Sequence, residues 1–533
     1  MASSLPSLPV FRAIAKHDPA SPAVLHSVSG RSFTYGDLLG DVARARDRLR
    51  EARGGADLNG ERIAFLVENS YDYVVTLLAV LAARSIAVPL SPAFPASELE
   101  YILNHSEASL LVSSAKFASK ADEVLATALA SKPAHFRLEK HIGGQQTRED
   151  VSFDDQGGPG AAGLMLYTSG TTNRPKGVLL PQSVLTAQSQ SLMEAWNYSP
   201  ADRLLHVLPL HHIHGAINAL LTPLFAGASI EFMFPFNADA VWKRLAAPFL
   251  RGESPESQLQ RPKPITFFTV VPTVYSRLLA SHASLPQEVR EAASEAVSPQ
   301  HMRLGISGSA ALPTPVKAAW CELSGGNVLL ERYGMTEVGM ALSCGLDFAD
   351  RVDASLRGPT IFQEYWRNPE ATASEFVDDA DGGGKWFKTG DVAIRRTVPS
   401  AGSGARQPWA KGPMYFIQGR VSADIIKTGG EKVSALEVER ELLSLPEVAE
   451  VAVVAVPSGS WGQKVGAVVV LDTDVVRKWS PLEMRRALKS RLANYKIPQT
   501  LKVVDHIPRN AMGKINKKQL VKAVFADEFS DDE

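Results

Sequence analysis

The first third of the chain alternates between short apolar runs and longer segments with helical spacing. Residues 62–67 and 86–90 are apolar runs of strand length, and residues 71–84 between them form an apolar helical segment. Residues 109–113 repeat the strand-like pattern. Strand, helix and strand at this spacing are typical of βαβ units, whose strands lie parallel in one sheet. The pattern therefore predicts an α/β fold with mostly parallel sheets and flanking helices.

The pattern changes after about residue 420. Apolar, β-branched runs at 448–456 and 466–471 predict strands, and residues 481–492 predict a basic helix. Together these segments predict a compact α+β unit. A chain of 533 residues is also too long for one hydrophobic core. We therefore divide it into a large N-terminal domain, residues 1–420, and a small C-terminal domain, residues 421–533.

The composition argues against several classes of function. The net charge of −1 gives no indication of a nucleic-acid partner. No apolar run approaches the roughly 20 residues that span a bilayer, so no stable membrane insertion is expected. Only two cysteines are present, Cys321 and Cys344, which fits a reducing compartment without disulfides. We expect a cytoplasmic protein. Residues 1–16 contain Arg12 and Lys16 but no acidic residue, a weak resemblance to a transit peptide that leaves a mitochondrial location open. The oligomeric state also stays open.

A polar, glycine-bearing loop at residues 167–177 joins two apolar segments. Glycines allow backbone N–H groups to converge on an anion, hydroxyls donate further hydrogen bonds, and a lysine supplies positive charge. A Walker A loop ends in Gly-Lys-Ser/Thr, whereas here Pro175 precedes Lys176 and Gly177 follows it. The loop predicts a phosphate site, with a solvated hairpin loop as the alternative. The candidate ligands are Thr168, Ser169, Gly170, Thr171, Thr172 and Lys176.

Three histidines, His211, His212 and His214, lie close together in residues 207–215. Zinc sites seldom use adjacent residues, and no cysteine lies nearby, so a metal site is the least favoured interpretation. A histidine of the core or of a turn is the second interpretation. We favour a role on the substrate side, with His212 in the wall of an acyl pocket.

A small-residue turn follows the strand predicted at residues 302–306. Ser307 and Gly308 in this turn would allow a ligand to approach the backbone. Arg303 lies on the same strand and has two interpretations. It is either a solvated charge at the sheet edge or an anchor for a carboxylate of the substrate.

Further polar residues follow strand-like segments in the second half of the chain. Thr336 and Glu337 offer a hydroxyl and a carboxylate oxygen, which Mg²⁺ takes as ligands beside substrate phosphates. A solvated Thr-Glu pair in a turn is the alternative. Asp391 follows a glycine turn and could accept both hydroxyls of a ribose, and Arg420 lies in a turn after a strand. Lys514 follows a glycine in a loop, and by itself predicts only a solvated lysine.

The order of these motifs resembles the adenylate-forming superfamily of acyl-CoA synthetases over nearly the whole chain. Residues 208–215, 331–341 and 424–437 look most like malonyl-CoA synthetases. The shared motifs are the hydroxyl–glycine–lysine loop, Pro-x-x-His-x-x-Gly at 209–215, Tyr-Gly-Met-Thr-Glu at 333–337, Thr-Gly-Asp at 389–391, Gly-Arg at 419–420 and Arg-Asn-x-x-Gly-Lys at 509–514.

The resemblance implies an ATP-dependent acid–CoA ligase with two half-reactions. A carboxylate, malonate in the first place, attacks the α-phosphate of ATP and gives an acyl-adenylate and pyrophosphate. The thiol of CoA then attacks the acyl carbonyl. The resemblance also implies a requirement for Mg²⁺. The small domain would be mobile and would turn between the two steps near residues 422–424.

The same resemblance gives each candidate residue a role. The β- and γ-phosphates would be held by Thr168, Ser169, Gly170, Thr171, Thr172 and Lys176. The Mg²⁺ ligands would be Glu337 and Thr168. The rest of the nucleotide would be held by Thr336 at the α-phosphate and by Tyr333, Asp391 and Arg420. Lys514 would bridge the carboxylate and the α-phosphate. The acid pocket would contain His212, Arg303, Ser307 and Gly308, with Arg303 and His212 at the second carboxylate of malonate.

The chain departs from the family pattern after Cys344. Residues 353–355 run almost directly into Arg-Gly-Pro at 357–359, where the family has a few tens of further residues and several strands. A deletion near residues 355–356 is therefore expected. Two alternatives to a malonate ligase stay open. One is a ligase for short- or medium-chain or aryl acids. The other, motivated by the deletion, is a non-catalytic homologue that binds a nucleotide or an acyl group.

Overall fold

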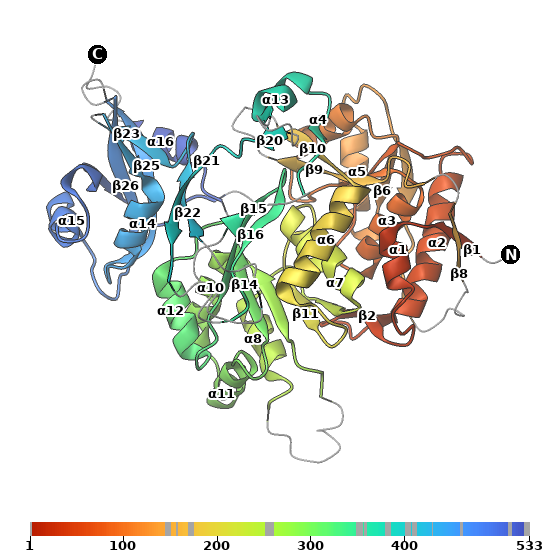
Figure 1. The fold of residues 1–533 in the computed structure, drawn as a ribbon, viewed down its shortest axis with the longest axis horizontal. Helices are drawn as coiled ribbons and strands as arrows, with labels where there is room; N and C mark the ends of the chain where they lie inside the picture. The colour runs from red at the N-terminus through yellow and green to blue at the C-terminus, as the bar shows by residue number, and fades with distance from the viewer. Residues whose placement is uncertain are drawn as a thin grey trace.

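The computed structural model has a large N-terminal part and a small C-terminal domain (Figure 1). The structure describes residues 3–143, 151–155, 158–168, 175–250, 261–347, 355–356, 360–378, 385–399, 407, 413–428, 430–458, 462–509 and 514–526. The N-terminus lies at one end of the molecule and the small domain, blue in Figure 1, at the other. The predicted two-part α/β fold is confirmed.

A seven-stranded sheet forms the core of the first part of the chain. Its strands, in spatial order, are β18 (Glu364–Tyr365), β10 (Lys176–Pro181), β9 (Gly163–Thr168), β5 (Ile86–Pro89), β4 (Arg62–Leu66), β6 (Leu110–Ser113) and β7 (Ala134–Arg137). The strands from β9 to β7 are parallel, and β10 and β18 are antiparallel to their neighbours. The predicted βαβ units and their strands are thereby confirmed.

A nine-stranded sheet lies beside the first and contributes most of the predicted site. Its order is β17 (Ser355–Leu356), β16 (Gly339–Ser343), β15 (Leu330–Met335), β14 (Leu304–Gly308), β13 (Phe267–Val270), β11 (Arg203–His206), β12 (Ser229–Phe232), β2 (Pro22–His26) and β3 (Ser32–Thr34). The strands from β15 to β2 are parallel. Because parallel strands end at the same edge, the turns after β14 and β15 are neighbours.

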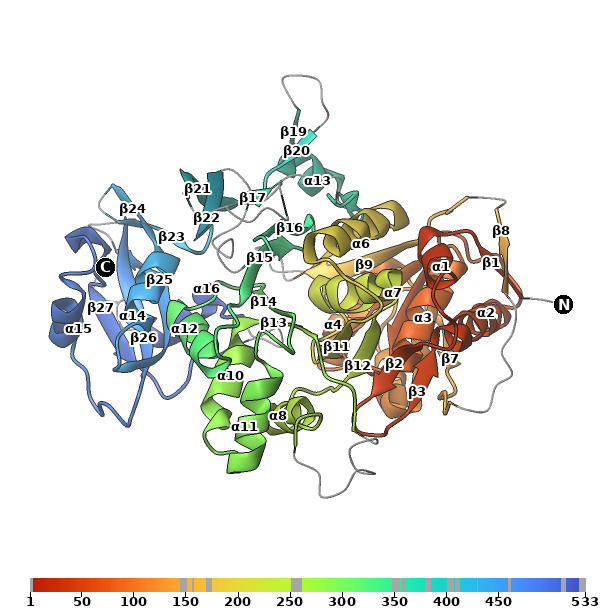
Figure 2. The ribbon, with the colours of Figure 1, turned by 60° about the horizontal axis from the view of Figure 1, so that its bottom comes forward.

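Helices cover both large sheets (Figure 2). Helix α2 (Tyr35–Glu51) begins at a capping box of Thr34 and Asp37. Every residue of α3 (Tyr71–Ala82) is buried, as expected for a helix that is apolar all round. The other helices of the large part are α1 (Pro9–Ile14), η1 (Ala115–Phe117), α4 (Ala96–Ser106), α5 (Ala118–Leu125), α6 (Gln182–Trp196), the π-helix η2 (His214–Leu221), α7 (Thr222–Ala226), α8 (Ala238–Ala246), α10 (Pro272–His282), α11 (Gln287–Ala296), α12 (Thr314–Leu323) and α13 (Pro369–Glu375).

The described residues of the large part also form three two-stranded ribbons: β1 (Ser3–Pro6) with β8 (Val151–Asp154), β19 (Phe376–Asp378) with β20 (Lys385–Phe387), and β21 (Asp391–Thr397) with β22 (Pro413–Arg420). The ribbon of β21 and β22 lies between the nine-stranded sheet and the small domain (Figure 1). No residue of β21 is buried, and its last five are exposed. In the described structure this strand therefore pairs on one side and packs little.

The small domain is a five-stranded sheet with helices. Its elements are β23 (Ile425–Thr428), β24 (Glu431–Ser434), α14 (Ala435–Leu443), β25 (Val448–Ser458), β26 (Gly462–Leu471), α15 (Pro481–Leu488), η5 (Asn494–Lys496), β27 (Thr500–Val503) and α16 (Lys517–Val524). Two apolar clusters, one on each side of β25 and β26, form its own core. The predicted strands at 448–456 and 466–471 are confirmed.

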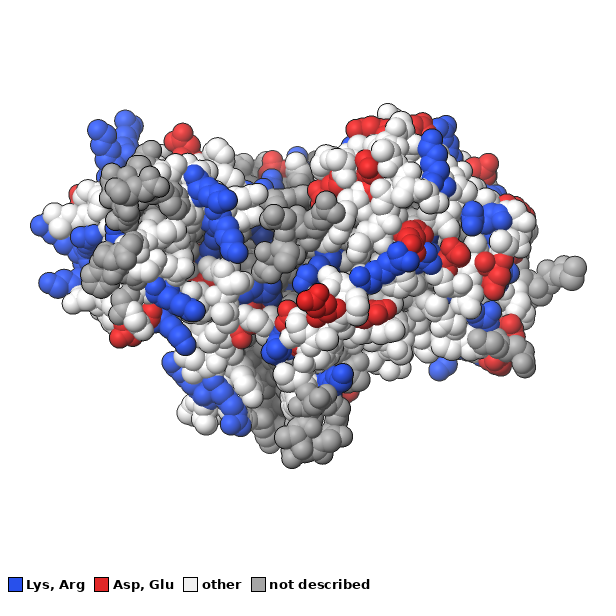
Figure 3. All heavy atoms as spheres, turned by 90° about the horizontal axis from the view of Figure 1, so that it is seen from above, with Lys and Arg blue, Asp and Glu red and all other residues white. Residues whose placement is uncertain are grey.

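Charge is distributed unevenly over the surface. On the face shown in Figure 3, Lys and Arg predominate over the small domain, whereas both signs mix over the large part. None of the described helices combines the length and apolar character that a bilayer span requires.

Candidate active site

The Thr-Glu pair lies in the tight turn between the antiparallel strands β15 and β16. Gly339, which ends this turn, has a φ of +69°, and a Cβ there would lie 1.6 Å from Oε1 of Gln188. The same oxygen of Gln188 accepts a hydrogen bond of 2.7 Å from the backbone of Met340. Helix α6 thus fixes the turn that carries Thr336 and Glu337, and only glycine fits at its end.

Glu337 is buried, and polar side chains lie next to its carboxylate. Tyr365 donates a hydrogen bond of 3.0 Å to Oε1 of Glu337, and Nζ of Lys176 lies 4.5 Å from the centre of the Tyr365 ring. Burial raises the pKa of Glu337, although Tyr365, Arg420 and Lys176 partly offset this effect. A bound cation would favour the charged carboxylate, so Glu337 fits the role of a Mg²⁺ ligand.

The phosphate loop begins and ends on paired strands. Thr168 ends β9, Lys176 begins β10, and the two residues are register partners. Helix α4 holds both ends of the loop: Tyr101 donates a hydrogen bond of 3.0 Å to the carbonyl of Pro175, and the ring of His105 shares one of 2.8 Å with Tyr167. The predicted ligands between these ends, Ser169, Gly170, Thr171 and Thr172, lie outside the described residues.

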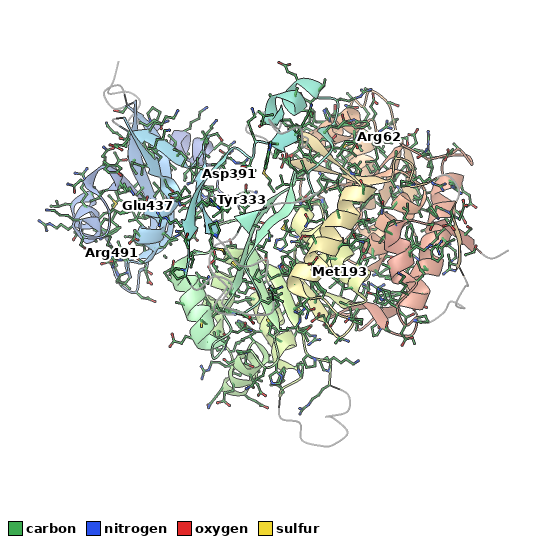
Figure 4. All side chains as sticks on the ribbon, viewed as in Figure 1. Arg62, Met193, Tyr333, Asp391, Glu437 and Arg491 are labelled. Atoms are coloured by element: carbon green, nitrogen blue, oxygen red, sulfur yellow. The ribbon has the colours of Figure 1, made fainter. Side chains whose placement is uncertain are left out.

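Asp391 and Arg420 are opposite each other in the ribbon of β21 and β22. Nε of Arg420 donates a hydrogen bond of 2.9 Å to Oδ1 of Asp391, and the hydroxyl of Tyr333 donates to Oδ2. Figure 4 shows Tyr333 and Asp391 close together at the junction of the two parts. An ionised carboxylate offers about four acceptor positions, so Asp391 keeps capacity for ribose hydroxyls. The structure brings these three predicted residues together.

Lys514 comes from the small domain and reaches the same junction. The residue keeps an exposed surface, yet its ammonium group lies among groups of the large part. Burial and the charge of Arg420 lower the pKa of Lys514, and Arg332 adds to this, whereas Glu337 and Asp391 raise it. Only a cation near all four side chains would respond in this way. The structure thus places Lys514 beside the predicted nucleotide and Mg²⁺ residues.

The histidine motif lies in a tight loop that leads into η2. A Cβ at Gly215 would lie 2.2 Å from the carbonyl oxygen of Pro209, so the backbone can close here only with glycine. Helix α3 contacts this loop: the hydroxyl of Tyr73 donates a hydrogen bond of 2.8 Å to the carbonyl of Leu210. A π-helical segment such as η2 often marks a functional site.

The histidines of this loop do not form a metal site. His214 shares a hydrogen bond of 2.7 Å with Thr269, and the rings of His211 and His212 lie 4.2 Å apart. No cluster of three metal-ligating side chains occurs among the described residues. Nε2 of His211 and Nε2 of His212 are both buried, and neither has a hydrogen-bond partner among the described residues. Burial lowers the pKa of His212, and the charges of His211 and Lys514 lower it further, so His212 lies on the side of the loop that faces Lys514.

The buried histidines predict acid sensitivity. Burial lowers the pKa of His206 and His211 to about 4, against 6.5 when exposed. Between these values the unfolded chain binds protons that the folded chain does not, so stability falls as the pH falls. We expect each of these histidines to cost up to about 1.4 kcal/mol of unfolding free energy per pH unit. Urea unfolding at a series of pH values measures this slope. His206→Gln should flatten it, whereas the exposed His506→Gln should not.

The role predicted for Arg303 is wrong. Arg303 lies at the amino end of β14, whereas Ser307 and Gly308 lie at the carboxyl end. Its guanidinium donates two hydrogen bonds, of 2.9 and 2.8 Å, to the carboxylate of Asp202 and a third to the carbonyl of Trp196. The Asp202 side chain is 3% exposed. Arg303 therefore neutralises a buried carboxylate of the protein and is not available to the substrate.

A different arginine lies at the carboxyl edge. Arg332 of β15 is the register partner of Gly308 and is 5% exposed. Its Nη2 donates to Oγ of Ser309 at 3.1 Å, and its Nε has no hydrogen-bond partner among the described residues. Burial lowers the pKa of Arg332, and its charge lowers that of His214. A buried guanidinium with an unused donor is suited to an anionic ligand.

Ser307 and Gly308 border this arginine, as their predicted place in the acid pocket requires. Oγ of Ser307 is buried without a partner among the described residues. A Cβ at Gly308 would lie 2.4 Å from Nε of Arg332, so this glycine makes room for the guanidinium.

We expect Gly308→Ala to displace Arg332 and to lower kcat/KM for a dicarboxylate by about tenfold, because overpacking of this kind costs ~1–3 kcal/mol. A monocarboxylate should be affected much less. Steady-state kinetics with both acids, after a melting curve has shown that the variant folds, measures the difference. Equal losses with both acids would contradict this role of Gly308.

Two residues of the site escaped prediction. Arg332 occupies a buried position of an alternating strand, with the buried Leu330 and the half-buried Glu331 before it. Arginine at such a position is rare unless it is paired, and this was the available signal. Tyr365 contacts Glu337 only because β18 pairs with β10, and its local sequence gives no such signal.

Comparisons with known proteins agree with this geometry. The family model described as AMP-binding enzyme matches residues 11–364, and the model described as AMP-binding enzyme C-terminal domain matches residues 437–514. A protein of Gibberella moniliformis named CoA ligase is 54% identical, with 97% of this chain and 94% of the relative covered. The human protein named malonate–CoA ligase ACSF3, mitochondrial, is 36% identical, with 97% and 92% covered.

Solved structures are also similar. The crystal structure of ATP-bound MatB from Rhodopseudomonas palustris has a TM-score of 0.76 to this chain and is 29% identical, with 100% and 99% of the two chains covered. The alignment with the Gibberella relative extends over 572 residues, more than the 533 of this chain. That relative therefore carries residues that have no counterpart here.

Family membership decides between an enzyme and a non-catalytic homologue in favour of an enzyme. ATP, Mg²⁺ and CoA are the substrates and metal ion of this class. The chain belongs to the AMP-binding enzyme family, and it is an AMP-forming acid–CoA ligase.

Proposed function

We propose that this ligase converts malonate to malonyl-CoA. The observation that carries the proposal is Arg332, a buried guanidinium with an unused donor next to Ser307 and Gly308. A second carboxylate cannot be buried without a partner, and a fatty-acid ligase would need an apolar wall at this place. The names of the human and Arabidopsis thaliana relatives, both of them malonate–CoA ligases, support the same acid.

In the proposed reaction the protein contributes positive charge and fixed geometry. Lys514 holds the reacting carboxylate against the α-phosphate, which Thr336 also contacts. Thr168, Lys176 and the loop between them hold the β- and γ-phosphates, and Asp391, Arg420 and Tyr333 hold the nucleoside. Glu337, with Thr168, would hold the Mg²⁺ ion, which neutralises phosphate charge when bound. His212 forms part of the acid pocket.

Lys514 must leave before the second half-reaction. In the proposed first step Lys514 lies beside the acyl group that the CoA thiol attacks next. Residues 421–424 connect β22 with β23 and form the short link between the two parts. We propose that the small domain turns about this link, and that the domain boundary lies after residue 420. The separate core of the small domain supports this boundary.

The test is acid-dependent exchange between ATP and pyrophosphate, measured with malonate, methylmalonate, acetate, hexanoate and benzoate. The proposal predicts the fastest exchange with malonate. Faster exchange with a monocarboxylate would overturn the malonate assignment and leave a ligase for short-chain, medium-chain or aryl acids. No exchange with any acid, from a chain that melts cooperatively, would count against the proposed function as a whole.

The segment expected near residues 355–356 is proposed to be absent from this chain. The longer alignment with the Gibberella relative and the exposed strand β21 both support this. For the compartment we propose the cytoplasm, supported by the two cysteines, which are not joined in a disulfide. The mammalian relatives are named mitochondrial, so fractionation of cells that produce the chain would decide between the two.

A further inference from the structure

A buried group of three charges lies where the two parts of the chain are connected. Nζ of Lys517 lies 2.7 Å from Oδ1 of Asp424 and 2.7 Å from Oε1 of Glu439. The three side chains are only 12%, 18% and 16% exposed. They come from the interdomain link, from α14 and from the first turn of α16. We call Asp424, Glu439 and Lys517 the link triad.

Asp424 contacts both sides of the link. Its Oδ2 accepts a hydrogen bond of 3.1 Å from the backbone of Arg420, which ends the last strand of the large part. Its backbone N–H also donates a hydrogen bond to the carbonyl of Arg420, and its carbonyl accepts one from the backbone of Ala435 in the small domain. A Cβ at Gly419 would lie 2.4 Å from that of Asp424, so the chain closes tightly here. The carboxylate of Asp424 thus joins the end of β22 to the ammonium of Lys517.

Lys517 is three residues after Lys514, so the two Cα atoms are at most about 11 Å apart. Glu439 is itself fixed, because its Oε1 accepts a hydrogen bond of 2.8 Å from the backbone of Val453 in β25. Burial opposes the charge of Lys517, but Glu439 and Asp424 outweigh it and raise the pKa of that lysine. Lys517 therefore stays charged, and its two partners fix the start of α16 relative to β22.

We propose that Lys517 is a positioning residue for the first half-reaction: through Asp424 it holds the segment before α16 so that Lys514 stays at the nucleotide site. The inference rests on the proposed role of Lys514 but goes beyond it, because Lys517 itself touches no substrate. The contact with Arg420 is made in this arrangement of the domains. Turning the small domain about residues 421–424 would change that contact, so the link triad favours adenylation over transfer to CoA.

The test compares two variants. Glu439→Gln keeps the ion pair between Lys517 and Asp424, and glutamine can still accept the hydrogen bond from Val453. Glu439→Gln with Lys517→Met removes the pair but leaves the buried group with the same net charge as the wild type. The two variants differ only at Lys517, so a difference between them reports the loss of its ammonium group and of the tie to Asp424. Melting curves of both show whether they fold.

Two measurements are made on both variants. Amide hydrogen exchange, followed by mass spectrometry without nucleotide, should be faster at residues 421–424 and 514–516 in the double variant. In the double variant, acid-dependent exchange between ATP and pyrophosphate, measured with the acid that the wild type prefers, should be at least tenfold slower than in Glu439→Gln. A loss of this size lies within the ~10²-fold that a small misplacement can cost. Transfer to CoA from enzyme-bound adenylate that has been formed beforehand should change less than about threefold.

The outcomes separate this inference from the proposed function. Equal hydrogen exchange in the two variants would overturn the inference, whatever the acid. Equal losses in both half-reactions, together with a lower melting temperature, would reduce Lys517 to a structural residue and also overturn it. If no acid supports exchange in the wild type, the proposed function fails, and the hydrogen-exchange comparison still decides the role of Lys517.

Discussion

Replacing Lys514 by alanine is expected to lower acid-dependent exchange of ATP and pyrophosphate by about 10²–10³-fold, the usual loss when one stabilising donor is removed from a reacting centre. The reason is its place among Glu337, Asp391, Arg332 and Arg420, where the phosphates and the carboxylate bring negative charge. Binding of ATP, measured by titration calorimetry, should weaken much less than the exchange rate.

Lys518 supplies the matched control for this experiment. It lies four residues further along, in the first turn of α16, and is exposed. Lys518→Ala removes the same charge from the same domain without removing a contact at the site, so exchange should stay close to that of the wild type. A comparable loss in both variants would show that total charge matters, and not the position of Lys514.

The second large effect concerns the choice of acid. Arg332→Met is expected to lower kcat/KM for malonate by about 10²-fold or more, because a carboxylate left unpaired in a buried site costs ~2–5 kcal/mol. Methionine is apolar and of similar length, so butyrate should be used as well as before or better. The ratio of kcat/KM for malonate and butyrate, measured at fixed ATP and CoA, is the quantity to follow.

Arg303→Met is the control for Arg332, and it should behave in the opposite way. It leaves the carboxylate of Asp202 without its guanidinium, which should cost roughly 2–3 kcal/mol of unfolding free energy, less than for a fully buried pair because Arg303 is about one third exposed. The malonate-to-butyrate ratio should not change. A ratio that falls with Arg303 and not with Arg332 would restore the role predicted from the sequence.

Strand and helix spacing predicted the fold well, because the central strands of the seven-stranded sheet are buried and carry clear apolar runs. The order of the motifs also named candidate residues that the structure brings together. Asp391, Arg420 and Tyr333 meet in the structure, and Lys514 reaches them from the other domain. That last contact depends on how the two parts lie together, which the sequence alone implied only through resemblance.

The acid pocket was predicted less well, for a physical reason. Arg303 and Arg332 each lie near Ser307 and Gly308, one in sequence and the other in space. Strand direction puts Arg303 at the amino end of β14, whereas ligands of parallel sheets bind at the carboxyl ends. Arg332 reaches that end only through the register of β14 and β15, which pairs it with Gly308. Spacing along one strand cannot reveal a register between two.

The ribbon of β21 and β22, in which β21 is largely exposed, would link a bound nucleotide to the folding of this part of the enzyme. A two-stranded ribbon is marginally stable by itself, and here its end is joined to the nine-stranded sheet through Asp391 and Tyr333. A ribose held by Asp391 and Arg420 would add a crosslink at the same end. Some of the intrinsic affinity for ATP is then spent on ordering the ribbon. In the empty enzyme this ribbon is where local unfolding and protease cleavage should begin, and AMP alone should slow both.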